Sequence, residues 1–264
     1  MRTFWKAVGI TAAIVFLAAA LICGLYFALK NGPMRPSGSK LPRNKLDPDQ
    51  YTVNDNGIVS CPGARQGIDV SSHQGEIDWN AVKAAGFDFA IIRIGYRGYS
   101  AGSVNIDEMF EQNYSEAIAA GLDVGVYFYS QAVSVAEAKE EAAFVVETLS
   151  KRSLTLPVFF DWEEVSQGRT GGKADSEVSS FAKQFCQTIE IAGYRAGVYF
   201  NQSYGYTIMR LSQMKNYDFW LAEYNDYQSF TYQVRFWQYT CNGHIDGVST
   251  RVDLDLMYPE EPEE

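Results

Sequence analysis

The chain has 264 residues, of which 47% are hydrophobic and 20% charged, and its formal net charge at pH 7 is −10. This length and composition are typical of a globular protein with one sizeable core and do not require a second domain. Seven basic residues and no acidic ones lie at or before Lys45, so the rest of the chain holds 15 basic and 32 acidic residues. A body with a charge of about −17 repels polyanions, which argues against nucleic acid as a partner.

The uncharged stretch at residues 7–29 (AVGITAAIVFLAAALICGLYFAL) is long enough to cross a membrane. Its 23 residues, at about 1.5 Å each, exceed a hydrocarbon core of roughly 30 Å. We predict an uncleaved transmembrane anchor, with residues 1–6 as a cytoplasmic N-terminus. The alternative is a cleaved signal peptide, whose apolar region is usually shorter.

The charges that flank this span argue for the opposite orientation. Two basic residues precede the span and five follow it. By the positive-inside rule, this distribution favours a cytoplasmic body. It therefore opposes the export that the motifs described below imply.

Residues 30–60 contain Pro, Gly, Ser and Asn without an apolar period. Such a composition is typical of a flexible tether, and we predict one here. The remaining residues, 61–264, are predicted to form the folded domain.

The four cysteines show no CxxC spacing, and the chain has only two histidines. We therefore predict neither a metal site nor a cofactor. Cys61 and Cys241 lie in loop-like surroundings, and the sequence is compatible with a disulfide between them or with two free thiols.

Short apolar runs alternate with amphipathic segments through the folded domain. Helical spacing occurs at residues 79–85, 109–120, 135–149 and 178–192. Repeated strand–helix units with apolar strands predict a parallel sheet that is buried on both faces, and eight strands allow such a sheet to close into a barrel. The last three strands have less regular connections, so this part departs from the repeat. The strands are predicted at 67–70, 89–95, 123–130, 156–163, 195–201, 218–224, 234–239 and 252–258.

The stretch PVFFDWEEV, residues 157–165, places acids directly after the fourth apolar strand. In such a barrel the C-terminal strand ends face the loops that form the site, so these acids are expected at its mouth. Asp161 and Glu163 are two residues apart and share a strand face, whereas Glu164 is expected to be solvated or to cap the next helix. Two carboxyls at this spacing can hold one proton between them, as glycoside cleavage requires.

Two further strands carry acids that are predicted to face the same end of the barrel. GIDVSS places Asp69 at the end of the first strand, and RVDLDLMY places Asp253 and Asp255 on one face of the last. Acids from three strands are therefore expected to meet. The sequence leaves open which of Asp253 and Asp255 lies in the groove.

Three ordered motifs, GIDVSSHQGEIDW (67–79), FDWEE (160–164) and WQYTCNGHIDGVSTRVDLDLMY (237–258), resemble glycoside hydrolase family 25. These are lysozymes that cleave the β-1,4 bond between N-acetylmuramic acid and N-acetylglucosamine. The resemblance covers residues 66–258 and leaves out the anchor and the tether. It implies a modified TIM-type α/β barrel of five βα units and three further strands, an extracellular site of action, and peptidoglycan glycan strands as substrate.

The same resemblance implies roles for four acids. Glu163 is the proton donor to the leaving sugar oxygen, and Asp161 holds the 2-acetamido group or stabilises positive charge at the anomeric carbon. Asp69 and Asp253 tune this pair. His73 stands where relatives commonly carry tyrosine; we predict no Ser–His hydrolase triad, because no nucleophile elbow surrounds it. Strand spacing does not fix the carboxyl separation, so inversion and retention both stay open.

Sugar binding requires flat apolar faces beside hydrogen-bonding groups, and tyrosine supplies both. Arg93 interrupts an apolar strand, and we expect it either to pair with a groove acid or to bind a lactyl or peptide carboxylate. A buried guanidinium demands a partner, which favours the first. The residues predicted to bind substrate are Tyr127, Tyr199 and Trp237, followed by Tyr129, Tyr224 and Arg93.

The sequence thus predicts a monomeric, lysozyme-type peptidoglycan hydrolase in the cell membrane, with one N-terminal span and an extracellular catalytic domain. Two other functions are compatible with it. A chitinase-like or endo-N-acetylglucosaminidase activity also uses a D-x-E pair at a strand end, and would release reducing ends from chitin oligomers. A non-catalytic wall-binding module would keep its wall binding after the substitution Glu163→Gln.

Overall fold

The computed structural model describes residues 41–172 and 175–260 of the chain. The predicted membrane anchor at 7–29 and the first part of the predicted tether lie outside these residues. Within the described part of the chain, none of the helices combines the length and the apolar character that crossing a membrane requires.

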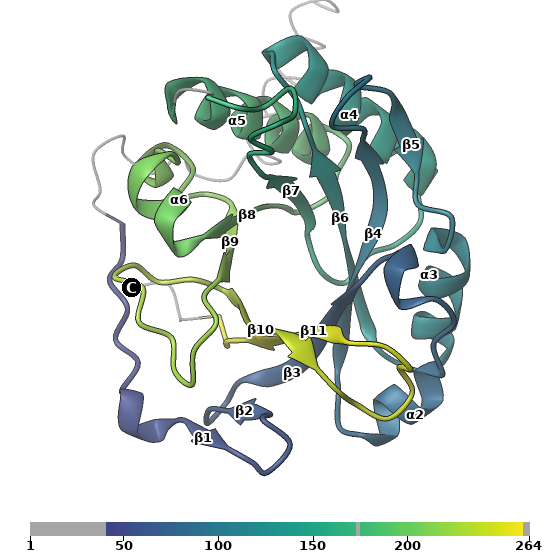
Figure 1. Cartoon of the computed structure of the whole chain (residues 1–264), viewed down its shortest axis with the longest axis vertical. Coiled ribbons are helices and arrows are strands. Elements are labelled where there is room, and N and C mark those ends of the chain that lie inside the picture. Colours follow the sequence, from purple (N-terminus) through teal and green to yellow (C-terminus); the bar gives the residue numbers. More distant parts are fainter. Residues whose placement is uncertain (1–40, 173–174, 261–264) are drawn as a thin grey trace, which may run out of the picture. The chain divides into compact units, whose positions relative to one another are not determined.

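Eight strands form a closed barrel with helices on its outer side (Figure 1). They pair in the order β3-β11-β10-β9-β8-β7-β6-β4, and the pairing of β3 with β4 closes the ring. Strand β11 runs antiparallel to both of its neighbours, and the other neighbouring pairs in the ring are parallel. This confirms the predicted barrel. Its strands are β3 (Arg65–Val70), β4 (Phe89–Arg97), β6 (Asp123–Ser130), β7 (Val158–Trp162), β8 (Ala196–Asn201), β9 (Asp218–Ala222), β10 (Phe236–Gly243) and β11 (Val252–Met257).

A helix follows each of the first five barrel strands, as the predicted βα units require. Asp78, Ser134 and Asn201 each accept a backbone N–H at a helix start, which satisfies a donor that has no partner within the helix. The α-helices are α2 (Trp79–Ala84), α3 (Phe110–Ala119), α4 (Val135–Leu149), α5 (Asp175–Ile191) and α6 (Gln202–Thr207). The shorter elements are β1 (Thr52–Val53), β2 (Val59–Ser60), β5 (Val104–Ile106), η1 (Pro48–Gln50), η2 (Ser72–Gln74) and η3 (Leu211–Gln213).

Aromatic rings fill the barrel interior, and glycines make room for them. A Cβ atom at Gly67 would lie 2.2 Å from the ring of Phe89, and one at Gly197 would lie 2.4 Å from the ring of Phe159. Both rings are fully buried. The interior of the barrel is therefore packed with side chains, as is usual for barrels whose sites lie at the carboxyl ends of the strands.

Residues 41–60 pack against the barrel (Figure 1, purple). The backbone N–H of Asn44 donates to the carbonyl of Thr231 (3.1 Å). The Tyr51 ring meets that of Trp237 edge-on at 5.6 Å, and its hydroxyl lies 2.8 Å from that of Tyr258. The prediction of a flexible tether up to residue 60 is therefore wrong for residues 41–60. This segment attaches through single side chains and short turns, which leave no periodic pattern in the sequence.

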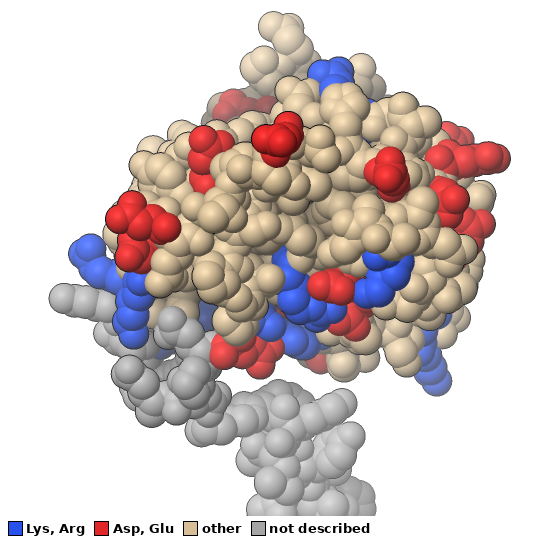
Figure 2. Space-filling model, turned by 90° about the horizontal axis from the view of Figure 1, so that it is seen from below, with Lys and Arg blue, Asp and Glu red and all other residues tan. Residues whose placement is uncertain are grey.

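Charged side chains of both signs are interspersed on the face of the molecule shown in Figure 2. Surface ion pairs among the described residues include Arg65 with Asp123 (2.6 Å) and Lys83 with Asp88 (2.9 Å). Exposed pairs of this kind contribute little to stability.

Candidate active site

A pocket with a volume of about 250 Å³ opens at the carboxyl ends of the parallel barrel strands. All four predicted catalytic acids line it, which brings together side chains from three strands. The acidic lining residues are Asp69, Asp161, Glu163 and Asp253, and the aromatic ones are Tyr127, Tyr129, Tyr199, Tyr224 and Trp220.

Strand β7 delivers two of these acids. Asp161 is its penultimate residue, and Glu163 follows the last. Trp162, between them, is 1% exposed and faces away from the pocket, where its indole N–H donates to the carbonyl of Ala132 (3.1 Å). Strand alternation therefore places both carboxyls on the pocket side, as predicted.

Neither carboxyl of this pair is hydrogen-bonded within the part of the chain that the structure describes. Asp161 is 6% exposed, and its Oδ1 atom is buried without a partner. Burial raises the pKa of Asp161, and so does Glu163, while Arg93 lowers it. Burial, followed by the charge of Asp253, raises the pKa of Glu163. Because a buried polar atom without a partner is costly, these oxygens are free to bind a ligand.

The strands β3 and β11 deliver a second group of acids. Because β11 is antiparallel, its first residues lie at the pocket end, where Asp253 pairs in register with Asp69. Asp255 lies one layer deeper, fully buried, and accepts a hydrogen bond from the Trp220 indole (2.8 Å). The amide of Gln238 donates to Asp69 Oδ2 (2.7 Å). Of the two candidates on β11, Asp253 lines the pocket and Asp255 does not.

This second group retains protons more strongly than ordinary carboxyls. Burial is the main cause, and it raises the pKa of Asp253 to about 6. Burial and the charges of Asp253 and Asp255 raise the pKa of Asp69. The negative charge of each of these carboxyls opposes the ionisation of its neighbours.

Arg93 on β4 also lines the pocket. Its Nε atom forms an ion pair with Asp107 Oδ2 (2.7 Å), and its Nη2 atom donates to Ser72 Oγ (3.1 Å). The expectation that Arg93 pairs with one of the groove acids is therefore wrong, because the partner is the buried side chain of Asp107. Asp107 also accepts the backbone N–H of Met109 (3.0 Å), just ahead of α3.

Trp237, predicted to line the groove, lies outside the barrel wall. It is fully buried and packs against Tyr51 and Tyr239, with 5.6 Å between ring centroids in each case. Its indole N–H donates to the carbonyl of Glu223 (2.8 Å). The prediction that Trp237 lines the groove is therefore wrong. Successive residues of a strand face opposite sides, and it is the next residue, Gln238, that faces the pocket.

Trp220 and Gln238 are among the lining residues that the sequence analysis did not single out. Trp220 on β9 packs against Tyr199 with 4.7 Å between centroids. Gln238 accepts hydrogen bonds from the hydroxyls of Tyr199 (3.0 Å) and Tyr224 (3.2 Å), while donating to Asp69. Gln238 is a polar residue within an apolar strand, as Arg93 is, and this feature of the sequence could have identified it as a residue of the site.

The remaining candidates have local roles. His73 lies on the pocket rim in η2, where its backbone N–H donates to Ser71 Oγ (3.2 Å). Glu164 is exposed, and its Oε1 accepts the backbone N–H of Gly172 (2.8 Å), in agreement with a solvated residue that supports the loop after β7.

The cysteines within the described residues are free thiols. Cys61 and Cys186 are buried, and Cys241 is exposed at the edge of the pocket, so the structure contains no bridge between Cys61 and Cys241. Over the described range, no three His, Cys, Asp or Glu side chains are grouped in a way that could hold a metal ion.

Comparison with known proteins gives several related lysozymes. The autolytic lysozyme of Clostridium acetobutylicum is 29% identical over 191 residues, which are 72% of this chain and 55% of that protein. Lysozyme M1 of Streptomyces globisporus is 27% identical over 223 residues, which are 78% of this chain and 70% of that protein. The chain thus spans little more than half the length of the Clostridium protein.

Solved structures show the same barrel. The modular autolysin LytC of Streptococcus pneumoniae, determined in complex with a synthetic peptidoglycan ligand, is 25% identical with a TM-score of 0.66, over 83% of this chain and 52% of that one. The lysozyme of Streptomyces coelicolor is 27% identical with a TM-score of 0.61, over 73% and 91%. The sequence model for glycosyl hydrolases family 25 matches residues 68–248. By this match, and by its barrel, the chain belongs to glycosyl hydrolases family 25.

Proposed function

We propose that the chain is a lysozyme-type peptidoglycan hydrolase that cleaves the β-1,4 bond between N-acetylmuramic acid and N-acetylglucosamine. The observation that carries this proposal is the pair Asp161 and Glu163 in the pocket, where Asp161 is buried with its Oδ1 atom unpartnered among the described residues and Glu163 is partly buried. The lysozyme names of the relatives, and the peptidoglycan ligand in the pneumococcal autolysin structure, support the substrate class.

Glu163 donates the proton in this mechanism. Burial and the nearby Asp253 raise its pKa, so that it keeps a proton closer to neutral pH than an ordinary glutamic acid. The proton passes to the glycosidic oxygen as the bond from that oxygen to the anomeric carbon breaks. Positive charge then develops on the anomeric carbon.

Asp161 stabilises that charge or holds the 2-acetamido group. Burial and the charge of Glu163 raise the pKa of Asp161, and the Arg93 guanidinium opposes this rise, so that a positive charge is at hand to stabilise the ionised form of Asp161. Its unpartnered Oδ1 atom can accept a hydrogen bond from an acetamido N–H or face the anomeric carbon. Asp69 and Asp253 set the local charge around both acids.

The aromatic lining supplies the binding surface for the sugar rings. Tyr127 and Tyr199 are 9% and 8% exposed in the pocket, whereas Tyr224 is 58% exposed at its edge. The buried rings limit the depth of the groove, and the exposed one offers a face on which a sugar can stack.

We also predict that the enzyme is a monomer anchored at residues 7–29, with this pocket outside the cell. Protease accessibility on intact cells would test on which side of the membrane the pocket lies.

The full-length protein should solubilise Gram-positive walls and create new reducing ends on muramic acid, as identified by mass spectrometry. We expect Glu163→Gln to lose about 10²- to 10⁴-fold in rate while it remains folded, because the amide cannot donate the proton. Glu164→Gln is the matched control, since it changes a neighbouring exposed acid whose contact an amide oxygen can keep.

Two outcomes would contradict the proposal in different ways. A Glu163→Gln variant that digests walls as fast as the wild type would remove Glu163 from the role of proton donor. New reducing ends on N-acetylglucosamine instead would indicate a chitinase-like or endo-N-acetylglucosaminidase activity.

A further inference from the structure

The direction of the Glu163 side chain depends on its backbone. Its carboxyl makes no hydrogen bond within the described residues, and Glu163 itself lies beyond the ladder between β6 and β7, whose last pair is Ser130 with Trp162. Whatever fixes the peptide group after Glu163 therefore fixes the direction in which its side chain leaves the backbone, and so limits where its carboxyl can lie.

The side-chain amide of Gln131 makes this contact. Gln131 follows the last residue of β6 and is fully buried. Its Nε2 atom donates to the carbonyl of Glu163 (2.7 Å) and to that of Ser130 (3.1 Å). Its Oε1 atom accepts from the hydroxyl of Thr170 (3.0 Å). Because donor and acceptor lie on one planar group, the amide fixes these partners relative to one another.

Thr170 closes the loop that begins at Glu163. Thr170 is fully buried, and its Oγ1 atom accepts the backbone N–H of Val165 (2.8 Å). The same atom lies 3.3 Å from the Glu163 carbonyl, so its single proton can serve either that carbonyl or the Gln131 amide. The loop is thus held at its start and its end by one amide and one hydroxyl.

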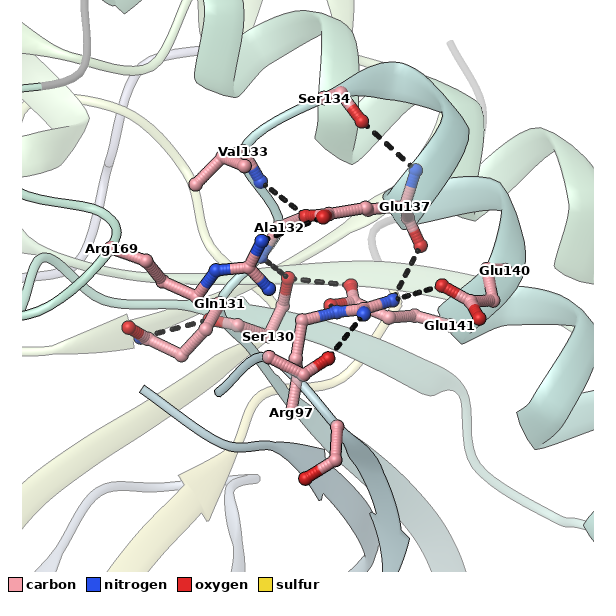
Figure 3. Close-up of polar contacts among 12 residues, drawn as sticks. Arg97, Ser130, Gln131, Ala132, Val133, Ser134, Glu137, Glu140, Glu141 and Arg169 are labelled. Carbon is pink, nitrogen blue, oxygen red and sulfur yellow. Dashed lines mark hydrogen bonds and ion pairs between the residues drawn. The ribbon is translucent and has the colours of Figure 1, made fainter. Parts of the chain in front are cut away.

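Acids of helix α4 fix the segment that carries Gln131 (Figure 3). The Ser130 hydroxyl donates to Glu141 Oε2 (2.6 Å) and accepts the backbone N–H of Ala132 (3.2 Å). Arg97 Nε donates to Glu141 Oε1 (2.6 Å). Burial raises the pKa of Glu141 to about 7, although Ser130 and Arg97 oppose this rise. The residues on both sides of Gln131 are therefore anchored to α4.

Glu137, also on α4, connects the loop after β6 to the loop after β7 (Figure 3). Its Oε2 atom accepts the backbone N–H of Val133 (2.9 Å), and its Oε1 atom forms an ion pair with Arg169 (2.6 Å). Arg169 immediately precedes Thr170. Helix α4 therefore fixes the two loops that the Gln131 amide joins.

We propose that Gln131 is a positioning residue for Glu163, with Thr170 as its partner, and this proposal rests on the proposed role of Glu163 as proton donor. Gln131 does not line the pocket and touches Glu163 only through the backbone carbonyl. Its loss should therefore affect proton transfer and leave substrate binding intact. A displacement of a catalytic group by about 1 Å can cost about 100-fold in rate.

The test uses Gln131→Met in the full-length protein, because methionine keeps the length of the side chain and removes both hydrogen-bonding ends. With soluble peptidoglycan fragments as substrate, we expect kcat to fall by about 10- to 100-fold and KM to stay within about twofold. Gln228→Met is the matched control. Gln228 is 2% exposed, does not line the pocket, and hydrogen-bonds to Asn44 and the Phe230 carbonyl. Its replacement should lower the melting temperature and leave kcat within about twofold.

A second pair of variants decides the question if Gln131→Met does not fold. Thr170→Val removes the hydroxyl, and we expect kcat to fall by about tenfold, whereas Thr170→Ser keeps the hydroxyl and should stay within about twofold of wild type. The positioning role is overturned if Thr170→Val and any folded Gln131→Met keep wild-type kcat, or lose no more than Gln228→Met. If Glu163→Gln is inactive at the same time, only the positioning role fails; if the wild type cleaves no peptidoglycan, the proposed function fails with it.

Discussion

The pocket contains two groups of carboxyls that the protein holds in different ways. Asp69, Asp253 and Asp255, from β3 and β11, form a bonded group: Asp69 accepts a hydrogen bond from the Gln238 amide, Asp255 Oδ1 accepts one from the Trp220 indole, and Asp253 pairs in register with Asp69. Asp255 Oδ2 is buried without a partner. At the end of β7, Asp161 Oδ1 is likewise buried without a partner among the described residues. In the mechanism proposed above, the bonded group sets the charge of the pocket, while Asp161 and Glu163 keep their oxygens available for substrate. The proposal thus assigns different roles to the two groups.

Asparagine substitutions in the two groups give the largest expected difference. Asp161→Asn removes the negative charge that the proposed mechanism places beside the anomeric carbon, and we expect activity to fall by about 10²- to 10³-fold. Asp255→Asn keeps an oxygen that can accept from the Trp220 indole, so activity should fall by less than about tenfold. Initial rates of reducing-end release would measure both. Equal losses in the two variants would remove the distinction between the groups.

Asp253, in the bonded group, should make the stability of the protein fall as pH rises. The pKa of Asp253 rises on folding from 3.8 to about 6, so the folded state binds its proton more strongly than the unfolded state. The contribution of the Asp253 carboxyl to the free energy of unfolding is fully present below about pH 4 and is lost as pH rises through about 6. The shift in its pKa corresponds to a contribution of roughly 3 kcal/mol. The asparagine side chain in the variant Asp253→Asn cannot lose a proton. The free energy of unfolding of this variant, relative to that of the wild type, should therefore increase as pH rises from about 4 to above 6.

Unfolding by denaturant at a series of pH values would measure this difference in the free energy of unfolding. Slopes from carboxyls that Asp253 does not influence are common to both proteins and cancel, so the difference reports Asp253 together with its effect on the pKa values of Asp69, Asp255 and Glu163. If the difference in the free energy of unfolding between Asp253→Asn and wild type is constant from about pH 4 to about pH 7, Asp253 does not retain its proton in the folded state.

The elements that sequence predicted well are those with a strong local pattern. The eight apolar runs and the four helical segments follow from periodicity, and the D-x-E pair follows from the end of one such run. Residues 41–60 have no period, so their packing on the barrel could not be foreseen. The choice between Asp253 and Asp255 depends on the antiparallel direction of β11 and on its register with β3, which only long-range pairing determines.

The same limit explains the placement of the tryptophans. Trp237 and Gln238 are consecutive in an apolar strand, and sequence did not establish which of the two faces the barrel interior. Trp220 was read as part of a buried strand, although its ring lines the pocket and its indole N–H holds Asp255 in the bonded group. One step along a strand exchanges the two faces, so small uncertainties in register have a large effect on the predicted site.

Phenylalanine substitutions of these two tryptophans give the smallest expected effects and test where each belongs. Trp237→Phe loses one buried hydrogen bond to the Glu223 carbonyl and part of its contact with Tyr51, and should lower the free energy of unfolding by about 1–2 kcal/mol. Its KM should stay within about twofold of wild type, because the ring does not line the pocket. Trp220→Phe frees an oxygen of Asp255 and alters the pocket wall, so its KM should rise by more. Denaturant unfolding and initial rates measure these quantities, and a larger rise in KM for Trp237→Phe would place its ring in the groove after all.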